Sequence, residues 1–496
     1  MVSVGKTVGE LASRVRGEVS GPGEALVTAI THDSRQVGPG SLFVAVRGST
    51  ADGHDFVLDA VKAGAVAVCV DHPMGSGVSE VVVADTRQAM GPLADAVYDH
   101  PSRALSVVGV TGTNGKTTVT HYIESISAAA GLQTGLIGTI ASRVGGVIVP
   151  SERTTPEAPD FQRMLRRMSD LGAQLVATEV SSHALALHRV DATKFAVAAF
   201  TNLSQDHLDF HGDMASYFQA KMRLFQQLEV GTAVVNIDDP AGREIAGRFS
   251  GNLLTVGESG DISWTAVRHG PAGTSFELRT PWGTGLVDAP VLGLFNVENA
   301  VMAAASCLVL GLGLDTVMAG LESLRQVPGR FELVSGDDPI RIVVDYAHTP
   351  TAVELAVDSA RQSGAGRVIA VLGAGGDRDR TKRPLMGRAL ATADFAIVTS
   401  DNPRHEDPAV IVAQVLEGIP PGSDHEVEID RRRAIRRAID AAVAGDTVLI
   451  LGRGHEPFQE VDGGRIPFDD REVSTRALED LRNSAASGGD SGSMRR

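Results

Sequence analysis

The chain has 496 residues, a length that on the usual prior gives about three domains, each able to bury a core. Hydrophobic residues make up 43% and charged residues 21%, so the composition is that of a globular protein rather than a disordered one. The net charge of −16 argues against nonspecific nucleic-acid binding, which needs a basic surface, although local arginines and lysines can still bind an anionic small substrate.

Residues 1–103 alternate short β-type runs with helical ones and predict a small α/β domain. The expected strands are 25–32, 41–46, 65–70 and 80–84, and the clearest helix is 56–63. Two polar segments in this block, Asp33-Ser34-Arg35 and Ser49-Thr50-Ala51, are typical of turns when read alone.

A phosphate-loop pattern follows, with the sequence Gly112-Thr113-Asn114-Gly115-Lys116-Thr117-Thr118. It lies between a predicted strand at 104–110 and a predicted helix at 117–130. Such a junction binds anions because free backbone N–H groups and the helix dipole converge there. Lys116 is expected to reach the terminal phosphates of ATP and Thr117 to ligate Mg²⁺. Val110 stands where the full P-loop has its first glycine, so this is a shortened variant.

Further strands are predicted at 175–180, 196–202 and 232–236, alternating with helices. This alternation indicates a mostly parallel sheet whose ligands collect at the carboxyl ends of its strands. Glu179 lies at one such end. It is either a surface acid or a metal ligand that faces the phosphate loop.

A polar segment at 201–212 follows the next strand and contains two aspartates and two histidines, among them His207. The residues alone leave open a solvated loop or a metal site, although oxygen is the more usual Mg²⁺ ligand. Lys221 lies in a predicted amphipathic helix at 217–228, where a lysine most often lies on a solvated face.

Pro328-Gly329-Arg330 marks the next boundary, after which strands are predicted at 342–345, 368–372, 395–399 and 447–451. The whole is predicted to be an α/β protein of three α/β domains, at 1–103, 104–330 and 331–485. The central domain would be a P-loop parallel-sheet ATPase domain, and the C-terminal domain would be Rossmann-like. Residues 486–496, within a Ser- and Gly-rich end, are predicted to form a disordered tail.

The only two cysteines, Cys69 and Cys307, lie in apolar runs without paired spacing, so they are expected to be reduced core residues of a cytoplasmic protein. The N-terminus lacks the apolar core of a signal peptide, and no apolar run approaches a membrane-spanning length. We therefore expect neither a membrane nor a nucleic-acid partner, and a monomer.

Together these motifs resemble the Mur ligase family, the cytosolic ATP-dependent amino-acid ligases that build the peptidoglycan peptide. The resemblance extends to about residue 480 and is strongest to the members that add the third residue of the peptide. The segments that carry it, besides the phosphate loop, are Thr31-His32-Asp33-Ser34-Arg35, Thr154-Thr155-Pro156, Ser181-Ser182-His183, Tyr346-Ala347-His348-Thr349-Pro350, Gly375-Gly376-Asp377-Arg378 and Gly452-Arg453-Gly454-His455-Glu456.

The resemblance implies that ATP phosphorylates the γ-carboxylate of D-Glu in UDP-MurNAc-L-Ala-D-Glu and that an amine then attacks the acyl phosphate. It adds Asn202, Asn299 and Arg330 to the nucleotide and metal residues. It also implies that Lys221 is carbamylated, which would make it an anionic oxygen ligand suited to Mg²⁺. The implied metal residues are Thr117, Glu179, His207 and Lys221, and the implied catalytic residues are Lys116, Lys221, His207 and Glu179.

By the same resemblance, the first domain would hold the UDP end of the substrate and the middle of the chain its dipeptide. The residues implied are Ser34, Ser49, Thr50 and Ala51 for the first and Thr154, Thr155, Ser181 and Arg189 for the second. The family places Gln two residues before the arginine, whereas this chain has Leu187, a departure that affects one hydrogen bond to the substrate.

The incoming amino acid is predicted to be meso-diaminopimelate rather than L-lysine. The two differ by a carboxylate, and Asp401-Asn402-Pro403-Arg404 follows a strand end with an arginine that can hold a carboxylate through two parallel N–H bonds. Family members that select diaminopimelate carry this segment, and the resemblance implies that Arg378, Gly452 and Glu456 hold the rest of the molecule. Read alone, Asn-Pro also favours a type I turn with an exposed arginine.

Two alternative functions can be distinguished by which of these sequence features they would explain. A neighbouring ligase that adds L-lysine, another amino acid or a dipeptide would share the ATP residues but lack the segment 401–404. A P-loop regulatory or transport ATPase would share only the loop and would leave Glu179, His207 and Lys221 unexplained. Because substrate groups are assigned to all three domains, we also expect the domains to close around the reactive centre.

Overall fold

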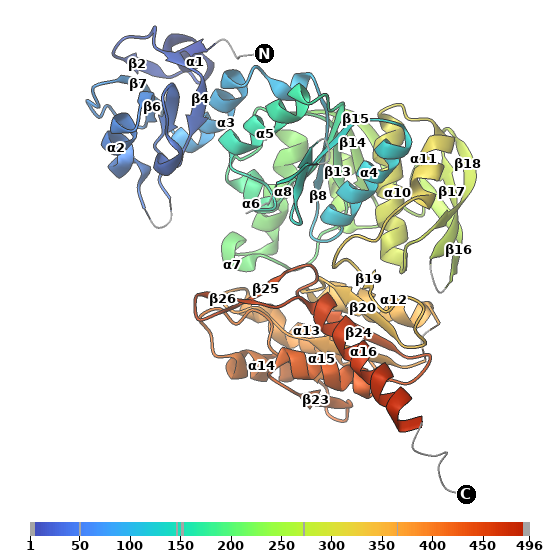
Figure 1. Ribbon diagram of the computed structural model, residues 1–496. Coiled ribbons are helices and arrows are strands. Elements are labelled where there is room, and N and C mark those ends of the chain that lie inside the picture. The colour runs from blue at the N-terminus through green and yellow to red at the C-terminus, as the bar shows by residue number, and fades with distance from the viewer. Residues whose placement is uncertain are drawn as a thin grey trace, which may run out of the picture.

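The computed structural model describes residues 5–48, 51–144, 147–149, 153–270, 273–364 and 366–489. It contains three α/β domains in chain order: the first lies at one side of the central domain, and the third packs below it (Figure 1). The predicted fold class, three α/β domains built on parallel sheets, is confirmed.

The N-terminal domain has a five-stranded sheet in the order β2-β7-β6-β5-β4, parallel except for β2. The prediction of a single strand at 25–32 is wrong. Its first part pairs with β1, its second part joins the main sheet, and Thr28 between them donates its N–H to Gly40 O at 2.9 Å. The elements are β1 Lys6–Thr7, α1 Val8–Arg14, β2 Glu18–Ser20, β3 Leu26–Val27, β4 Ala29–Thr31, η1 Ser34–Gln36, β5 Ser41–Val44, η2 Gly53–Phe56, α2 Val57–Lys62, β6 Ala65–Val70, β7 Ser79–Val82, α3 Thr86–Val97 and η3 Pro101–Arg103.

The central domain has an eight-stranded sheet in the order β11-β10-β9-β12-β8-β13-β14-β15, antiparallel only where β10 pairs with its neighbours. Its strands are β8 Ser106–Thr111, β9 Thr134–Ile137, β10 Ser142–Val144, β11 Val147–Val149, β12 Leu175–Glu179, β13 Lys194–Phe200, β14 Glu229–Asn236 and β15 Asn252–Val256. Its helices are α4 Lys116–Ala129, α5 Ala158–Asp170, α6 Ser182–Ala186, α7 Leu208–His211, α8 Met214–Gln226, α9 Pro240–Arg248, α10 Leu294–Val309 and α11 Leu314–Glu322.

Helices cover both faces of this sheet, and each face forms its own apolar core. Ile123 of α4 and Val301 of α10 pack on one face, and Phe161 of α5 and Met222 of α8 pack on the other. Each fully buried side chain of this size contributes about 1.5–3 kcal/mol. The strand β8 is therefore buried on both sides, which explains why its sequence is a nearly continuous apolar run and why its end, the phosphate loop, is rigidly placed.

A three-stranded antiparallel sheet extends the central domain, and sequence analysis did not predict it. It consists of β16 Ser263–His269, β17 Thr274–Thr280 and β18 Gly283–Ala289 and contacts α11. In β17, the buried residues Phe276 and Leu278 alternate with the more exposed Glu277 and Arg279. This is the period-2 pattern of a strand with one buried face, so the signal was present in the sequence.

The C-terminal domain has a six-stranded sheet in the order β19-β20-β24-β21-β22-β23, parallel except for β19. Helices α12, α13 and α14 cover one face, and α15 and α16 cover the other, a doubly wound, Rossmann-like arrangement. The elements are β19 Glu332–Leu333, β20 Arg341–Asp345, α12 Pro350–Gln362, β21 Val368–Leu372, η4 Arg380–Lys382, α13 Arg383–Leu390, β22 Phe395–Val398, α14 Pro408–Leu416, β23 His425–Val427, α15 Arg431–Asp440, β24 Thr447–Leu451, β25 Phe458–Val461, β26 Gly464–Pro467 and α16 Asp470–Gly489.

The last helix overlaps the predicted tail. Because α16 continues to Gly489, it includes residues 486–489, the first four of the segment predicted to be disordered. Two alanines at 485–486, the best helix formers, extend the helix into the segment whose Ser and Gly content suggested disorder. The rest of the predicted tail lies outside the described residues.

Two further expectations concern the whole chain. Cys69 and Cys307 are buried and unpaired, as predicted for core thiols. Among the described residues, no helix combines the length and the apolar character needed to cross a membrane.

Candidate active site

A cavity of about 770 Å³ lies between the carboxyl ends of the central strands and the start of the C-terminal domain. It gathers most of the residues that the sequence singled out, from segments far apart in the chain. Its lining includes Gly112, Thr113, Asn114, Gly115, Lys116, Thr117, Thr118, Thr154, Thr155, Glu179, Ser181, Arg189, Asn202, His207, Lys221, Asn299, Arg330 and Arg378.

The phosphate loop depends on its two glycines. Gly112 and Gly115 have φ values of +147° and +88°, and α4 begins directly after the second. A Cβ at Gly112 would lie 1.9 Å from Thr201 Oγ1, and one at Gly115 would lie 2.3 Å from Asn299 Oδ1. Both backbone conformation and space therefore require glycine, and the loop N–H groups can approach a ligand closely.

Lys116 follows the loop and folds back over it. Its Nζ donates to Gly112 O at 2.9 Å and to Thr113 O at 2.7 Å. Burial lowers the pKa of this amine, and the charges of Glu179 and Asp206 only partly oppose the effect. The amine is thus held at the phosphate loop by neutral carbonyl oxygens, and an anion placed there would favour its charged form.

Glu179 is a fixed, internal carboxylate, and its interpretation as a surface acid is wrong. It is 1% exposed, accepts the Thr117 hydroxyl at 2.9 Å and accepts the Thr139 N–H at 2.7 Å. Arg330 donates to the same Thr117 hydroxyl at 3.1 Å. A hydroxyl and a carboxylate side by side next to a phosphate loop are oxygen ligands of the type that Mg²⁺ prefers.

Lys221 does not lie on a solvated face, the interpretation that its helix alone favoured. It is 1% exposed, donates to Gly112 O at 2.8 Å and lies 4.4 Å above the centre of the Tyr217 ring. Burial, and then the charge of Lys116, hold the pKa of Lys221 well below its usual range. A neutral amine is the form that reacts with CO₂, so the site suits carbamate formation.

His207 faces the same cavity and packs edge to face against His183, with ring centres 4.8 Å apart. Burial lowers the pKa of His207 to about 3, so its imidazole is neutral near pH 7 and its nitrogen can accept a metal. The oxygens of Thr117 and Glu179 fit Mg²⁺ as they stand. Lys221 fits the ion only as a carbamate, because an ammonium would repel it.

A buried ion pair joins the central and C-terminal domains beside this site. Lys382 Nζ donates to Asp206 Oδ1 at 2.9 Å, and His348 Nε2 lies 3.4 Å from Asp206 Oδ2. Although burial opposes ionisation, His348 and Lys382 keep the pKa of Asp206 well below its usual range. This pair could not be predicted from the sequence: Asp206 belongs to the polar segment 201–212, but nothing local distinguishes Lys382.

The residues implied for the dipeptide form one hydrogen-bonded group at the start of α6. The Thr155 hydroxyl donates to Glu179 O at 2.8 Å and accepts the Ser181 N–H at 3.2 Å. Arg189 donates to Thr155 O at 3.3 Å and pairs with Glu157 at 3.0 Å. Leu187, which replaces the family's Gln, ends α6 and is half-buried.

A second cavity, of about 930 Å³, lies between the N-terminal and central domains. Ser34 and Ala51 line it from the first domain, and several arginines line it from the second, including Arg163 and Arg167. Arg153 lines both cavities. Ser49 and Thr50 lie outside the described residues, so their predicted role is not placed by the structure.

The segment 401–404 lies apart from the first cavity, in the C-terminal domain. Asn402 Nδ2 donates to Glu456 Oε2 at 2.7 Å, and Gly452 has a φ of +115° with no room for a Cβ beside Asp401 Oδ2. Burial and the charge of Asp401 raise the pKa of Glu456. Pro403 completes the turn, since its carbonyl accepts the N–H of residue 406.

Arg404 is not the exposed turn residue that Asn-Pro alone favoured. Its side chain is 20% exposed, its Nε donates to Glu460 Oε2 at 2.9 Å, and its Nη1 donates to Gly376 O at 2.7 Å. Glu460, which sequence analysis missed, therefore orients the guanidinium. Among the described residues, no hydrogen-bond partner is found for its Nη2 group.

The family models agree with this arrangement. The model "Mur ligase family, catalytic domain" matches residues 26–98, "Mur ligase middle domain" matches 110–307, and "Mur ligase, glutamate ligase domain" matches 329–454. The chain therefore belongs to the Mur ligase family, and the predicted resemblance is confirmed.

Individual relatives are more specific. The UDP-N-acetylmuramoyl-L-alanyl-D-glutamate–2,6-diaminopimelate ligase of Geobacillus thermodenitrificans is 46% identical over 467 residues, covering 92% of this chain and 96% of the relative. The ligase of the same name from Aquifex aeolicus is 44% identical, with coverage of 91% and 94%. A solved structure of a ligase with this name superposes with a TM-score of 0.70 at 32% identity, over 96% of this chain and 99% of the other.

Proposed function

We propose that this chain is an ATP-dependent amide ligase that joins meso-diaminopimelate to the D-Glu of UDP-MurNAc-L-Ala-D-Glu. The observation that carries the proposal is the single cavity in which the phosphate loop, the Thr117–Glu179 pair and Arg189 meet. The relatives at 41–46% identity, which bear the name of this ligase, support the same substrates.

The first step is phosphoryl transfer from ATP to the γ-carboxylate of D-Glu. Two anions must approach, so catalysis consists mainly of positioning and of neutralising charge. Lys116 would bind the β- and γ-phosphates, with Arg330 behind the Thr117 hydroxyl. Mg²⁺, held by Thr117 and Glu179 and by Lys221 as a carbamate with His207, would supply further positive charge to the phosphates.

The second step is attack of the diaminopimelate amine on the acyl carbon. The tetrahedral intermediate collapses by breaking the bond between carbon and the phosphate oxygen, which releases inorganic phosphate and leaves the amide. Asn402 and Glu456 would hold the amino acid, and Arg404 its distal carboxylate. Water must be excluded from the acyl phosphate, which the buried Asp206–Lys382 contact between domains favours.

The mechanism makes a sharp isotopic prediction. If the γ-carboxylate of D-Glu carries ¹⁸O, one labelled oxygen must leave with the inorganic phosphate. ADP release should require the UDP-dipeptide, and net amide formation should require diaminopimelate. ATP hydrolysis that is independent of both substrates, with unlabelled phosphate, would favour a regulatory or transport ATPase instead.

The choice between diaminopimelate and L-lysine needs its own test. An arginine that lacks its carboxylate partner would face the ammonium of lysine, so we expect strong discrimination. Competition between the two amino acids at equal concentration, read from product masses, measures it directly. We place the reaction in the cytoplasm, where ATP is available, and expect a monomer, which sedimentation would test.

A further inference from the structure

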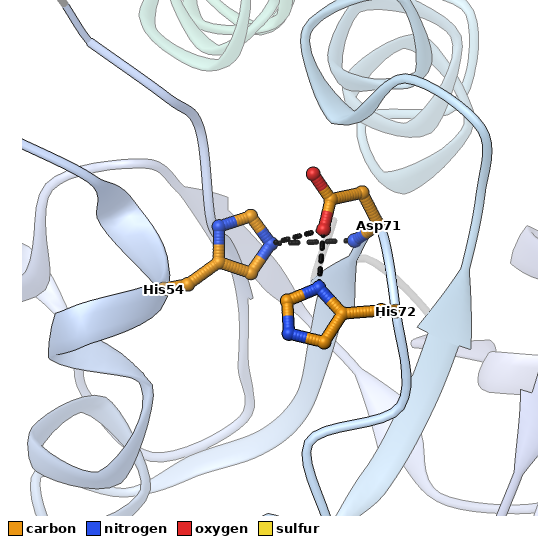
Figure 2. A group of neighbouring side chains, drawn as sticks. All are labelled: His54, Asp71 and His72. Atoms are coloured by element: carbon orange, nitrogen blue, oxygen red, sulfur yellow. Dashed lines mark hydrogen bonds and ion pairs between the residues drawn. The ribbon is translucent and has the colours of Figure 1, made fainter.

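A separate cluster of ligand-type side chains lies in the N-terminal domain (Figure 2). His54 belongs to η2, and Asp71 and His72 directly follow β6. One nitrogen or oxygen from each residue lies within 4.8 Å of the others, and none of the three lines either cavity described above. The cluster therefore lies outside the two cavities, next to Gly53 and Phe56, which line the second one.

The buried histidine of this cluster is oriented as a metal ligand would be. Asp52 Oδ1 lies 2.6 Å from His54 Nδ1 and accepts its hydrogen, so Nε2 carries a lone pair, which accepts the backbone N–H of Asp71 at 3.3 Å. A histidine ligand commonly donates its other ring N–H to a carboxylate in this way, which fixes the tautomer and the ring. His54 is only 6% exposed, so the ring has little freedom to turn.

The spacing also fits a small divalent ion. His54 Nε2 lies 3.2 Å from Asp71 Oδ1, and a bound cation would take the place of the long hydrogen bond that Nε2 accepts from the Asp71 N–H. Ligands at about 2.0–2.1 Å from a tetrahedral Zn²⁺ lie about 3.3–3.4 Å apart, close to this distance. His72 Nδ1 lies 2.5 Å from the same oxygen as a hydrogen-bond donor and must give up that proton and move outward by about 1 Å. Its side chain is 54% exposed, which leaves room for that movement.

The surroundings leave one carboxylate oxygen for the ion. Arg47 Nε lies 3.0 Å from Asp71 Oδ2 and holds that oxygen, so Oδ1 remains directed at the two histidines. Gly53 donates its N–H to Val46 O at 2.9 Å, and a Cβ on Gly53 would not fit beside Val46. This close contact fixes the position of the next residue, His54.

We propose that His54, Asp71 and His72 form a Zn²⁺ site, with water as the fourth ligand. Two imidazoles and one carboxylate are the donor set of open four-coordinate zinc sites. The ion would join the end of β6 to η2. Its effect would be on the stability of the N-terminal domain.

Zinc binding to the full-length chain tests this proposal. Metal-free protein in excess Mg²⁺ is titrated with Zn²⁺, and with Co²⁺ as a spectroscopic probe, and bound metal is counted after dialysis. We expect wild type to bind one Zn²⁺ more than His72→Ala and Asp71→Asn. Asp52→Asn, which changes the partner of His54 Nδ1 and keeps an oxygen to cap η2, should weaken binding about 10–100-fold. His425→Ala, at an exposed histidine of the C-terminal domain, should match wild type.

A thermal measurement separates a lost ion from a lost fold. In EDTA, wild type and His72→Ala should melt at similar temperatures, because His72 is exposed. Added Zn²⁺ should raise the Tm of wild type but not that of His72→Ala. Equal zinc stoichiometry and affinity in wild type and His72→Ala would overturn the proposal, since the ion would then be bound elsewhere, for example at the histidines near His207.

Discussion

The two ends of the proposed reaction site carry charge differently. In the part of the chain that the structure describes, neither Lys116 nor Lys221 forms an ion pair, and both amines donate to backbone carbonyls. In the C-terminal site Arg404 pairs with Glu460. In the first site, the positive charge of the two amines is left for the phosphates of a ligand. In the second site, the arginine already has a carboxylate partner of opposite charge, which suits a zwitterion with two carboxylates and two amines.

Burial disfavours charge at both ends of the site. It lowers the pKa of Lys116 and Lys221, which are amines, and it raises the pKa of Glu456, a carboxylic acid, where the charge of Asp401 adds to the effect. Because Lys116 and Lys221 lie at the phosphate loop, substitutions there should abolish chemistry, whereas those at the amino-acid end should mainly affect the affinity for one substrate.

The largest effect is expected for Lys116→Ala. Loss of the cation at the phosphate loop removes a contact to the transferred phosphate, so kcat/KM should fall about 10³-fold or more. Steady-state ligation assays measure this, with circular dichroism to verify folding. Lys62→Ala, at an exposed lysine of α2, is the matched control. Near-normal turnover by folded Lys116→Ala would contradict the assignment of the loop.

Lys221→Ala should have the next largest effect. The ligation activity should fall about 10²-fold or more, because a metal-ligating carbamate cannot form. Excess bicarbonate should not restore activity. ¹³C NMR of wild type in ¹³C-bicarbonate should show a carbamate signal that Lys221→Ala lacks and that the exposed-site control Lys194→Ala keeps. Active wild-type enzyme without this signal would show that the lysine acts unmodified.

On the amino-acid side, Arg404→Ala should raise the KM for diaminopimelate about thirtyfold, the value of a charged hydrogen bond near 2 kcal/mol. The KM for ATP should change less than about twofold, because the phosphate loop lies in another domain. Initial-rate kinetics separate the two, and Arg388→Ala, on the exposed face of α13, is the control. Equal changes in both constants would mean a general loss of structure.

The Asp206–Lys382 contact between the domains should affect activity less than the substitutions above. Lys382→Met leaves Asp206 buried without its cation, so the central and C-terminal domains should separate more readily. We expect kcat to fall about tenfold and the radius of gyration in X-ray scattering to increase. Lys382→Arg, which keeps the charge, should retain most activity. Unchanged scattering and activity in Lys382→Met would argue that the pair does not hold the domains.

The last prediction concerns pH and acts on stability rather than on turnover. Burial lowers the pKa of His121 to about 4 and that of His455 to about 3, whereas both titrate near 6.5 when unfolded. Between these values the unfolded chain binds more protons, so the free energy of unfolding falls as the pH drops below 6.5, by about 1.4 kcal/mol per pH unit for each histidine. Urea unfolding at several pH values measures the slope. His455→Gln should reduce it, and an unchanged slope would refute this account.

The sequence predicted what is local and missed what requires distant partners. The phosphate loop could be predicted because a strand end, a glycine and a lysine within a few residues define an anion site. Glu179 could be predicted because it lies at the carboxyl end of an apolar strand. The burial of Lys221 could not, because it depends on the carbonyl of Gly112, 109 positions away. The Asp206–Lys382 pair, 176 positions apart, has no local signal.

Two errors had a different cause. The antiparallel sheet β16–β18 and the division of the predicted strand at 25–32 were readable from residue alternation and from turn geometry. Both were missed because a βα pattern was expected throughout those stretches. The domain bounds and the roles of individual site residues remain predictions that the substitutions above address.

Arg153 belongs to the walls of both cavities, Thr154 and Thr155 line the first, and Pro156 and Glu157 line the second, so the two cavities adjoin. A substrate anchored by its nucleotide in the N-terminal cavity would deliver its peptide end to the phosphate loop without further diffusion. The reaction then becomes intramolecular, and the tether sets the effective concentration of the carboxylate. A dipeptide without the nucleotide would reach the phosphate loop only from free solution. Its reaction rate should therefore fall by far more than the lost contacts to the nucleotide would explain.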